Sequence, residues 1–528
     1  MLNTGDLTAA CVRPLTPSQV TFASFEGTMA ASPYQQLEEE FRRLHAFRGA
    51  LALLRWDAAV MMSRGSADVR GDQLAAIEME CHALLTAPKV SRLLDRAQAN
   101  GQMLEDWQIA NLREMRRQRD HAIATPNNLI SRLAKASARA EIHWLEARRS
   151  GQFADVAPHL AEVVSLTRDR AALLGSHLGL SPYDALIDEF SPGVTTAEID
   201  GLFKAVGHRL PAMVRDALAE QASRPVAPLV GKFPASKQRA LCVEVMKSLG
   251  FPFDRGRLDE SEHPFTEGMA GDIRITTRFN PTDPFQGLLG ALHETGHALY
   301  DLGLPTEWRS QPVGRNRGMA LEESQSLIFE KMVVRSRPFL SYLKPLLEKH
   351  YGVSGPEWEV ENLYRHLTRV HHGLSRADAD ELTYPAHIMM RYELEKQLLS
   401  GELSVAQLPE AWNEASLSRL GIQPSNDVDG CLQDIHWYVG QFGYFPAYAL
   451  GGLIAMQLWE RLRSDREELD VELARGDFSG LSSWLRTHVY EVGARMTVQD
   501  LVKEATDRPL SSAPALRYLE AKYFESIP

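Results

Sequence analysis

Apolar residues recur every three or four positions along most of this chain, and this spacing is the strongest constraint on its fold. The pattern begins at Tyr34, after which Leu37, Phe41 and Leu44 fall on one face of a helix. It continues, with short breaks at Gly and Pro clusters, to the end of the 528 residues. The sequence shows no clear internal repeat of the length that is typical of solenoid proteins. We therefore predict a mainly α-helical protein, with a single large helical body over residues 34–528.

One segment departs from the helical pattern. Within residues 263–279, Ile273 and Ile275 are separated by the polar Arg274. A period of two with β-branched residues is typical of a β-strand. We therefore predict one small β-hairpin or sheet. It precedes the most informative helix of the sequence, so we expect it near the functional residues.

Residues 1–33 lack the helical periodicity. They mix Thr, Ser, Pro and Asp, and they contain neither the basic start nor the apolar centre of a secretory signal. We expect a loose N-terminal tail, with Met29 as an alternative start of the protein.

Charge and cysteine content argue against several classes of protein. A net charge of −12 disfavours a nucleic-acid binder, whose surface would be basic, and disfavours binding to anionic membranes. No apolar run approaches the roughly 18 residues of a membrane span. The four cysteines lie far apart and form no CxxC pair, so we expect neither a disulfide framework nor a cysteine zinc site. Scattered, reduced thiols are typical of a cytoplasmic protein.

The most informative helix contains an HExxH motif. His293, Glu294 and His297 lie within residues 284–304, which carry an apolar helical face. Because residues four apart lie one turn apart, both imidazoles can reach one metal ion. Glu294 can then reach a water on that metal and act as general base. The alternative is two ordinary histidines on a packed or exposed helix. Gly296 costs helix propensity, which indicates close packing or close approach of a substrate.

A catalytic zinc needs a third protein ligand and one open position for water. Glu322 and Glu323 enter the next amphipathic helix, and we predict that Glu323 is the third ligand. The alternative is that both carboxylates only stabilise the positive N-terminus of that helix. Two histidines, one glutamate and one water would form a zinc site that polarises a carbonyl and activates water.

Further motifs follow one another in a fixed order. They are HPF at 263–265, DIRIT at 272–276, ESQ at 323–325, RADAD at 376–380, DIHW at 434–437 and GYFPAYALG at 443–451. With the HExxH motif, this order resembles that of the thermostable carboxypeptidase Taq family of zinc metallocarboxypeptidases. The resemblance covers roughly residues 34–525 and includes the opening helix around residues 54–57.

The resemblance implies a mostly helical fold with a deep central groove and activity with zinc or cobalt. It implies release of one C-terminal residue at a time from peptides, with broad specificity and poor action on C-terminal proline. It also implies a homodimer. Glu322 departs from the family, which usually has a histidine at this position. This carboxylate could change the specificity or tune the charge near the metal.

A carboxypeptidase must bind a free carboxylate, and arginine suits this task through paired hydrogen bonds. We predict that Arg376 binds it, since this residue matches the arginine of the family's RxxAD motif. The alternative is a structural salt bridge between Arg376 and either Asp378 or Asp380.

The tetrahedral intermediate needs a hydrogen-bond donor to its oxyanion. We favour Tyr448 and then His436 for this catalytic role, with Tyr444 as a substrate-binding neighbour. Each of these aromatic residues could instead serve only in packing.

Three further residues are weaker candidates. His263 precedes a proline and should be extended, where it contacts substrate or has a structural role. Arg274 could hold a peptide main chain or a carboxylate, and an extended substrate could add to the predicted strand. Asp301 could support a ligand histidine, although we expect it to be exposed to solvent.

Two alternatives to a metallocarboxypeptidase remain at this point. A metallo-oligopeptidase or endopeptidase could use the same zinc chemistry on a related helical groove. A helical scaffold could have kept the site and lost the activity, although the intact set of His293, Glu294, His297 and Glu323 argues against this.

Overall fold

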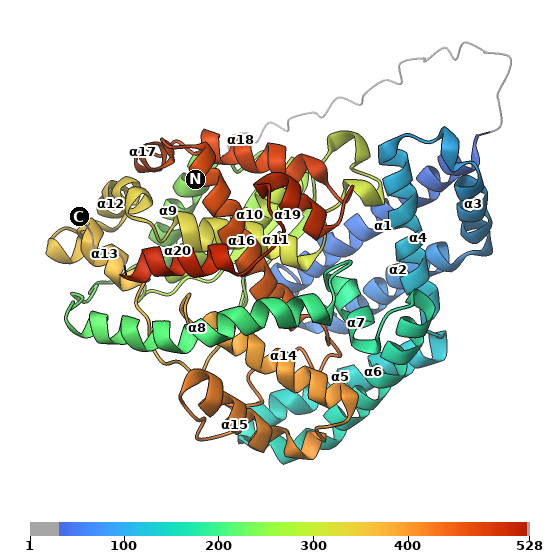
Figure 1. The fold of residues 1–528 in the computed structure, drawn as a ribbon, viewed down its shortest axis with the longest axis horizontal. Helices are drawn as coiled ribbons and strands as arrows, with labels where there is room; N and C mark the ends of the chain where they lie inside the picture. Colours follow the sequence, from blue (N-terminus) through green and yellow to red (C-terminus); the bar gives the residue numbers. More distant parts are fainter. Residues whose placement is uncertain (1–30, 525–528) are drawn as a thin grey trace, which may run out of the picture.

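The computed structural model describes residues 31–524, and α-helices dominate it (Figure 1). This confirms the mainly helical prediction. The tail predicted for residues 1–33 falls, for the most part, outside the described residues.

The first four helices form a unit with an apolar core of its own. They are α1 (Pro33–Val60), α2 (Ala67–Thr86), α3 (Pro88–Ala99) and α4 (Asp106–Ala124). Leu37 and Phe41 of α1 pack in this core with Leu94 and Met115. The unit lies at one side of the molecule in Figure 1, and α12 and α13 lie at the opposite side.

The remaining helices share one larger core. These are α5 (Asn127–Ser150), α6 (Ala157–Leu178), α7 (Pro182–Phe190), α8 (Thr196–Ala222), α9 (Ala235–Ser248), α10 (Gln286–Gly303), α11 (Met319–Leu327), α12 (Arg337–Tyr351), α13 (Val360–Leu367), α14 (Tyr384–Ser400), α15 (Leu408–Leu420), α16 (Phe445–Asp465), α17 (Leu469–Ala474), α18 (Ser479–His488), α19 (Val498–Thr506) and α20 (Ala513–Phe524). A π-helical turn, Ile328–Val333, continues α11.

A three-stranded mixed sheet stands where the sequence predicts a β element. Its strands are β1 (Gly256–Glu260), β2 (Thr266–Met269) and β3 (Asp272–Thr277), in the order β1-β3-β2. β2 and β3 form the expected hairpin, while β1 pairs in parallel with β3 and is additional. Ile273 and Ile275 are fully buried, as their alternation predicts. The sheet packs against α10 and so holds β2 beside the HExxH helix.

Two glycines let the helices of the site pack with their backbones in contact. A Cβ atom at Gly296 of α10 would lie 2.6 Å from the Cα atom of Ser326, which belongs to α11. A Cβ atom at Gly451 of α16 would lie 2.8 Å from the Cβ atom of Glu323. Both separations are too short for a real side chain, so only glycine fits. The close packing expected from Gly296 is therefore confirmed.

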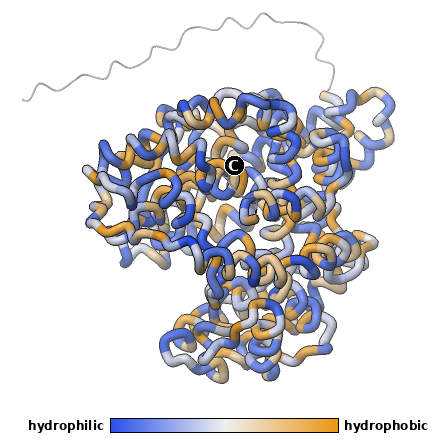
Figure 2. Tube along the Cα trace, turned by 60° about the vertical axis from the view of Figure 1, so that its left-hand side comes forward, coloured by the Kyte–Doolittle hydropathy of each residue, from blue (hydrophilic) through white to orange (hydrophobic). Residues whose placement is uncertain are grey.

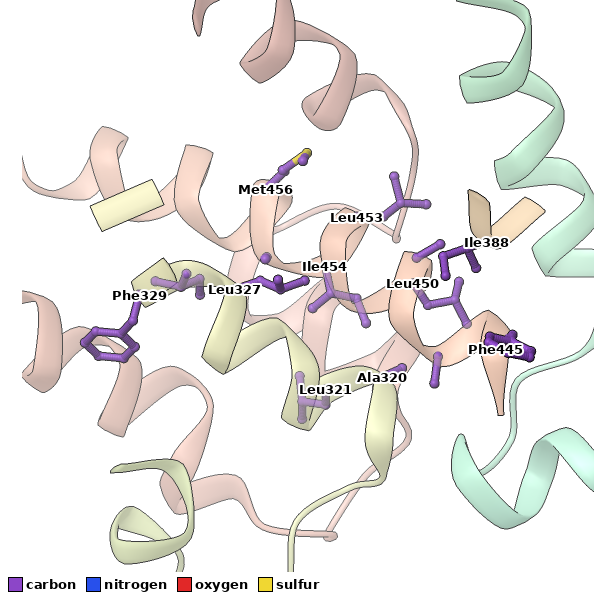
Figure 3. Close-up of a cluster of buried hydrophobic side chains, with 14 of the residues drawn as sticks. Ala320, Leu321, Leu327, Phe329, Ile388, Phe445, Leu450, Leu453, Ile454 and Met456 are labelled. Carbon is purple, nitrogen blue, oxygen red and sulfur yellow. The ribbon is translucent and has the colours of Figure 1, made fainter. Parts of the chain in front are cut away.

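Apolar packing between α11 and α16 surrounds these close contacts. Figure 3 shows Ala320 and Leu321 of α11 next to Leu450 and Ile454 of α16, and all four are buried. The α11–α16 interface is therefore closely packed beside Glu323.

Figure 2 shows apolar and polar residues interleaved along most helices. Within residues 31–524, no helix combines the length and the apolarity that a membrane crossing requires.

Candidate metal centre

Three side chains from α10 and α11 converge on one point. The ligand atoms of His293, His297 and Glu323 all lie within 4.8 Å of one another. The Nε2 atoms of the two histidines lie 3.9 and 3.7 Å from the same Glu323 carboxylate oxygen, Oε2. These distances exceed those of hydrogen bonds and leave room for an ion between the three groups. Two imidazoles and one carboxylate form a donor set that suits zinc.

Carboxylates outnumber cations at this point. Burial alone would lower the pKa of His293, but the Glu323 and Glu330 carboxylates raise it to about 9. Burial lowers the pKa of His297 far below its usual value, and His293 adds to this effect. Burial raises the pKa of both Glu294 and Glu323. A bound cation would favour the charged form of these carboxylates, which is the form that binds metal.

Glu330 supports His293 from the side opposite Glu323. Its Oε2 lies 3.0 Å from His293 Nδ1, and its other oxygen pairs with Lys331 and Arg335 at 2.7 and 2.9 Å. Sequence reasoning missed this residue. Its place two helical turns after Glu323 was the available signal, because such residues share a helix face.

Glu322 lies on the other side of the centre. Its Oε1 is 3.8 Å from His297 Nδ1, which is buried and has no hydrogen-bond partner within residues 31–524. Asn316 Nδ2 donates to Glu322 Oε2 at 3.0 Å and to Asp301 at 3.5 Å. The expected solvent exposure of Asp301 is therefore wrong: it is partly buried, reaches neither histidine and has a pKa that burial raises to about 6.

Glu294 points into a cavity of about 430 Å³. Thr266 of β2 donates from its hydroxyl to Glu294 Oε2 at 2.8 Å and lies 3.0 Å from the Glu294 carbonyl oxygen. The sheet therefore fixes this carboxylate, a contact that sequence reasoning missed. The cavity is lined by Thr266, His293, Glu294, His297, Glu322, Glu323, Arg376, Tyr384, Tyr444 and Tyr448, among others.

Arg376 reaches this cavity with its guanidinium fixed in place. Its Nε and Nη2 donate to Asp434 Oδ1 at 3.1 and 3.0 Å, and not to Asp378 or Asp380 as the alternative had it. Arg391 donates to the other oxygen of Asp434 at 2.6 Å. Burial would lower the pKa of Arg376, but Asp434 raises it above the usual value. The arginine is therefore charged.

Three aromatic residues predicted at the site cluster around Arg376. Its guanidinium lies 5.0 Å from the ring centroid of Tyr448, and the rings of Tyr444 and Tyr448 lie 5.1 Å apart. The Tyr448 hydroxyl is 3.5 Å from His436 Nε2. Burial lowers the pKa of His436 to about 4, so the imidazole is neutral at pH 7. The two tyrosines line the cavity, while His436 lies behind them.

Two predicted residues are not brought to the cavity. His263 is exposed, although Pro264 and Phe265 beside it line the cavity. Arg274 donates to Asp272 at 3.0 Å and lies 4.3 Å from a ring centroid of Trp56, on the sheet face turned to α1. Their substrate-binding roles stay predictions.

Known proteins match this chain over nearly its whole length. The family described as Carboxypeptidase Taq (M32) metallopeptidase matches residues 36–523. Thermostable carboxypeptidase 1 of Thermus thermophilus is 35% identical over 93% of this chain and 98% of its own. Among solved structures, Trypanosoma cruzi metallocarboxypeptidase 1 superposes with a TM-score of 0.91 at 37% identity, covering 93% of this chain and 99% of its own. The M32 carboxypeptidase of Deinococcus radiodurans R1 gives 0.88 at 33% identity, covering 93% and 98%.

Proposed function

Because this chain belongs to the carboxypeptidase Taq (M32) family of metallopeptidases and is thus a carboxypeptidase, we propose that it releases single C-terminal amino acids from peptides. We propose broad specificity with poor action on C-terminal proline. The observation that carries this proposal is that His293, His297 and Glu323 converge in the same cavity as Glu294 and Arg376.

His293, His297 and Glu323 would hold the metal, for which zinc is our first choice and cobalt the alternative. When bound, zinc would polarise the scissile carbonyl and lower the pKa of a water molecule. Glu294 then takes a proton from the attacking water and passes it to the leaving amine. Thr266 holds one oxygen of Glu294, so the other oxygen is free to exchange the proton.

Arg376 would bind the free carboxylate of the substrate. Asp434 occupies its Nε and Nη2, which leaves Nη1 outside this ion pair. The hydroxyl of Tyr448 would donate a hydrogen bond to the oxyanion, and the neutral His436 lies behind this tyrosine. Tyr444 packs beside Tyr448 and would line the pocket for the departing residue.

We further propose a homodimer in the cytoplasm. The family resemblance supports the dimer. Cys81, Cys242 and Cys431 are free and buried, which supports a reducing compartment.

The test uses an N-acetylated peptide with either a free or an amidated C-terminus, incubated with the zinc-loaded protein and followed by mass spectrometry. We expect stepwise loss from the free C-terminus only, and no loss with Glu294→Ala. Glu402→Gln removes an exposed carboxylate that does not line the metal cavity, and this variant should cleave the peptide like the unchanged protein. Internal cleavage of both peptides would instead indicate an oligopeptidase.

A further inference from the structure

A second cavity lies near the metal centre, and Asn316 in its lining contacts Glu322 of the metal cavity. It has a volume of about 180 Å³. It is lined by His45, Gly268, Met269, Ala270, Asp301, Leu304, Arg309, Gly314, Arg315 and Asn316. Asn316 links the two cavities: it lines the second one with Asp301, and its amide donates to Glu322, which lines the first.

Positive charge is in excess around this second cavity. Arg309 and Arg315 line it, and Arg48 lies close enough to act on both His45 and Arg315. Within residues 31–524 none of the three arginines forms an ion pair, and Arg48 has only an amide partner, Gln118, at 2.9 Å. Asp301 is the one acidic side chain in the lining, against the two arginines there, and Glu267 of β2 lies close enough to act on Asp301.

The neighbouring Arg317 is buried and has a direct counter-charge. Its guanidinium pairs with the Glu114 carboxylate at 2.9 Å. Burying a cation without such a partner is costly. The three arginines around the second cavity are partly buried and have no such direct partner within the described residues, although Asp301 acts on Arg315 from a longer distance.

Polar atoms in the cavity wall also lack partners. His45 Nδ1 and Arg309 Nε are buried without a hydrogen-bond partner in the described part of the chain. Burial, with Arg315, Arg48 and Arg309 nearby, lowers the pKa of His45 to about 4. Burial and Arg315 lower the pKa of Arg48 to about 9. A bound anion would relieve both the repulsion and the missing hydrogen bonds.

Two elements run from the metal centre to this cavity. β2 carries Thr266 at the metal end and Gly268 at the other, and α10 carries Glu294 and then Asp301. Seven residues of helix span about 10 Å, which is the length of about three residues of extended peptide. β2 is an edge strand of the described sheet, with β3 on one side only.

We propose that this second cavity binds a carboxylate side chain of the peptide substrate, an aspartate or glutamate about three residues before the scissile bond. The direction in which the peptide runs from the metal cavity rests on the proposed function. Arg376 lines the metal cavity and not this one, so a peptide whose free carboxylate is held there extends away from Arg376. Its upstream residues then pass along β2 toward Arg309 and Arg315.

The test compares two peptides, acetyl-Ala-Glu-Ala-Ala-Phe and acetyl-Ala-Gln-Ala-Ala-Phe, with the zinc-loaded full-length protein. We expect kcat/KM for the glutamate peptide to be about tenfold higher at low salt, the size typical of a hydrogen bond to a charged group. Arg315→Gln and Arg309→Gln should each bring the ratio close to one. Arg149→Gln removes an exposed arginine far from the cavity and should keep the tenfold ratio.

Equal kcat/KM for both peptides in the unchanged protein overturns the proposal, as does a preference that persists in both cavity variants. If the preference is absent but inorganic phosphate raises the Tm of the unchanged protein and not of Arg315→Gln, the cavity holds a free anion, and the peptide assignment is overturned. If neither peptide loses its phenylalanine, the proposed function has failed. Calorimetry then measures the affinity of the protein for each of the two peptides. Equal affinities overturn the proposal that the second cavity binds the glutamate side chain.

Discussion

The imidazole of His293 is held between two carboxylates: its Nδ1 lies 3.0 Å from Glu330, while its Nε2 faces Glu323. Burial would raise the pKa of Glu330, but Lys331 and His293 lower it far below its usual value, so this carboxylate stays charged. An ionised Glu330 accepts a hydrogen bond from Nδ1–H. When a metal ion displaces the second proton of the imidazole, the Nε2 lone pair is directed at the metal position.

Glu330→Gln should weaken metal binding. The amide is a poorer acceptor than the carboxylate and no longer fixes the tautomer of His293, so we expect about a 10- to 100-fold loss of zinc affinity. Competition with a chromophoric chelator measures this directly. Glu402→Gln is the control, and an unchanged affinity in Glu330→Gln would show that packing alone orients the imidazole.

Gly296→Ala should destabilise the protein. The added Cβ would lie 2.6 Å from a backbone atom of α11, so α10 and α11 must separate. Overpacking of this kind costs about 1–3 kcal/mol. Gly201→Ala is the matched control, because Gly201 also lies inside a helix but has open space around it. The control should gain up to about 1 kcal/mol from helix propensity. Denaturant unfolding compares the two, and equal stabilities would contradict the close-packing argument.

Arg376→Lys should impair substrate binding more than metal binding. Lysine keeps the charge but loses the fork that can engage Asp434 and a carboxylate together. We expect kcat/KM for peptides with a free C-terminus to fall about tenfold or more, mainly through KM, with zinc affinity unchanged. Arg149→Lys serves as the control. An unchanged KM would place the binding of the free carboxylate elsewhere.

Glu395 should make stability depend on pH. Burial raises its pKa to about 8 from the ordinary 4.5, although the Gly443 N–H donates to it. The neutral carboxyl is therefore the form that the fold favours. Its contribution to stability is complete below pH 4.5 and is lost as the pH rises through 8, at up to about 1.4 kcal/mol per pH unit.

Glu395→Gln removes this titration. Between pH 5 and pH 8, the free energy of unfolding of the unchanged protein should fall relative to that of the variant. Urea unfolding at three pH values in this range measures the difference. Parallel curves for the two proteins would show that Glu395 keeps an ordinary pKa.

The periodicity and spacing of the sequence were sufficient for the main outline. Helical recurrence predicted the fold class, and alternation around Ile273 predicted the hairpin. The four-residue spacing of His293 and His297 placed both imidazoles on one face of α10, because helix geometry is local. The motif order indicated the family, and Glu323 lies where the predicted ligand set requires it.

Tertiary structure alone decided which distant residues meet this site. Glu330 and Thr266 fix the ligand histidine and the base, and Asp434 fixes Arg376 in place of the nearby acids expected from the sequence. β1 joins the sheet in parallel, and the arginines of the second cavity come from α1 and from the segment after α10. These contacts join segments far apart in the chain, and packing of whole helices sets their geometry. Local periodicity fixes the face of a helix that a side chain occupies but not the element that packs against that face.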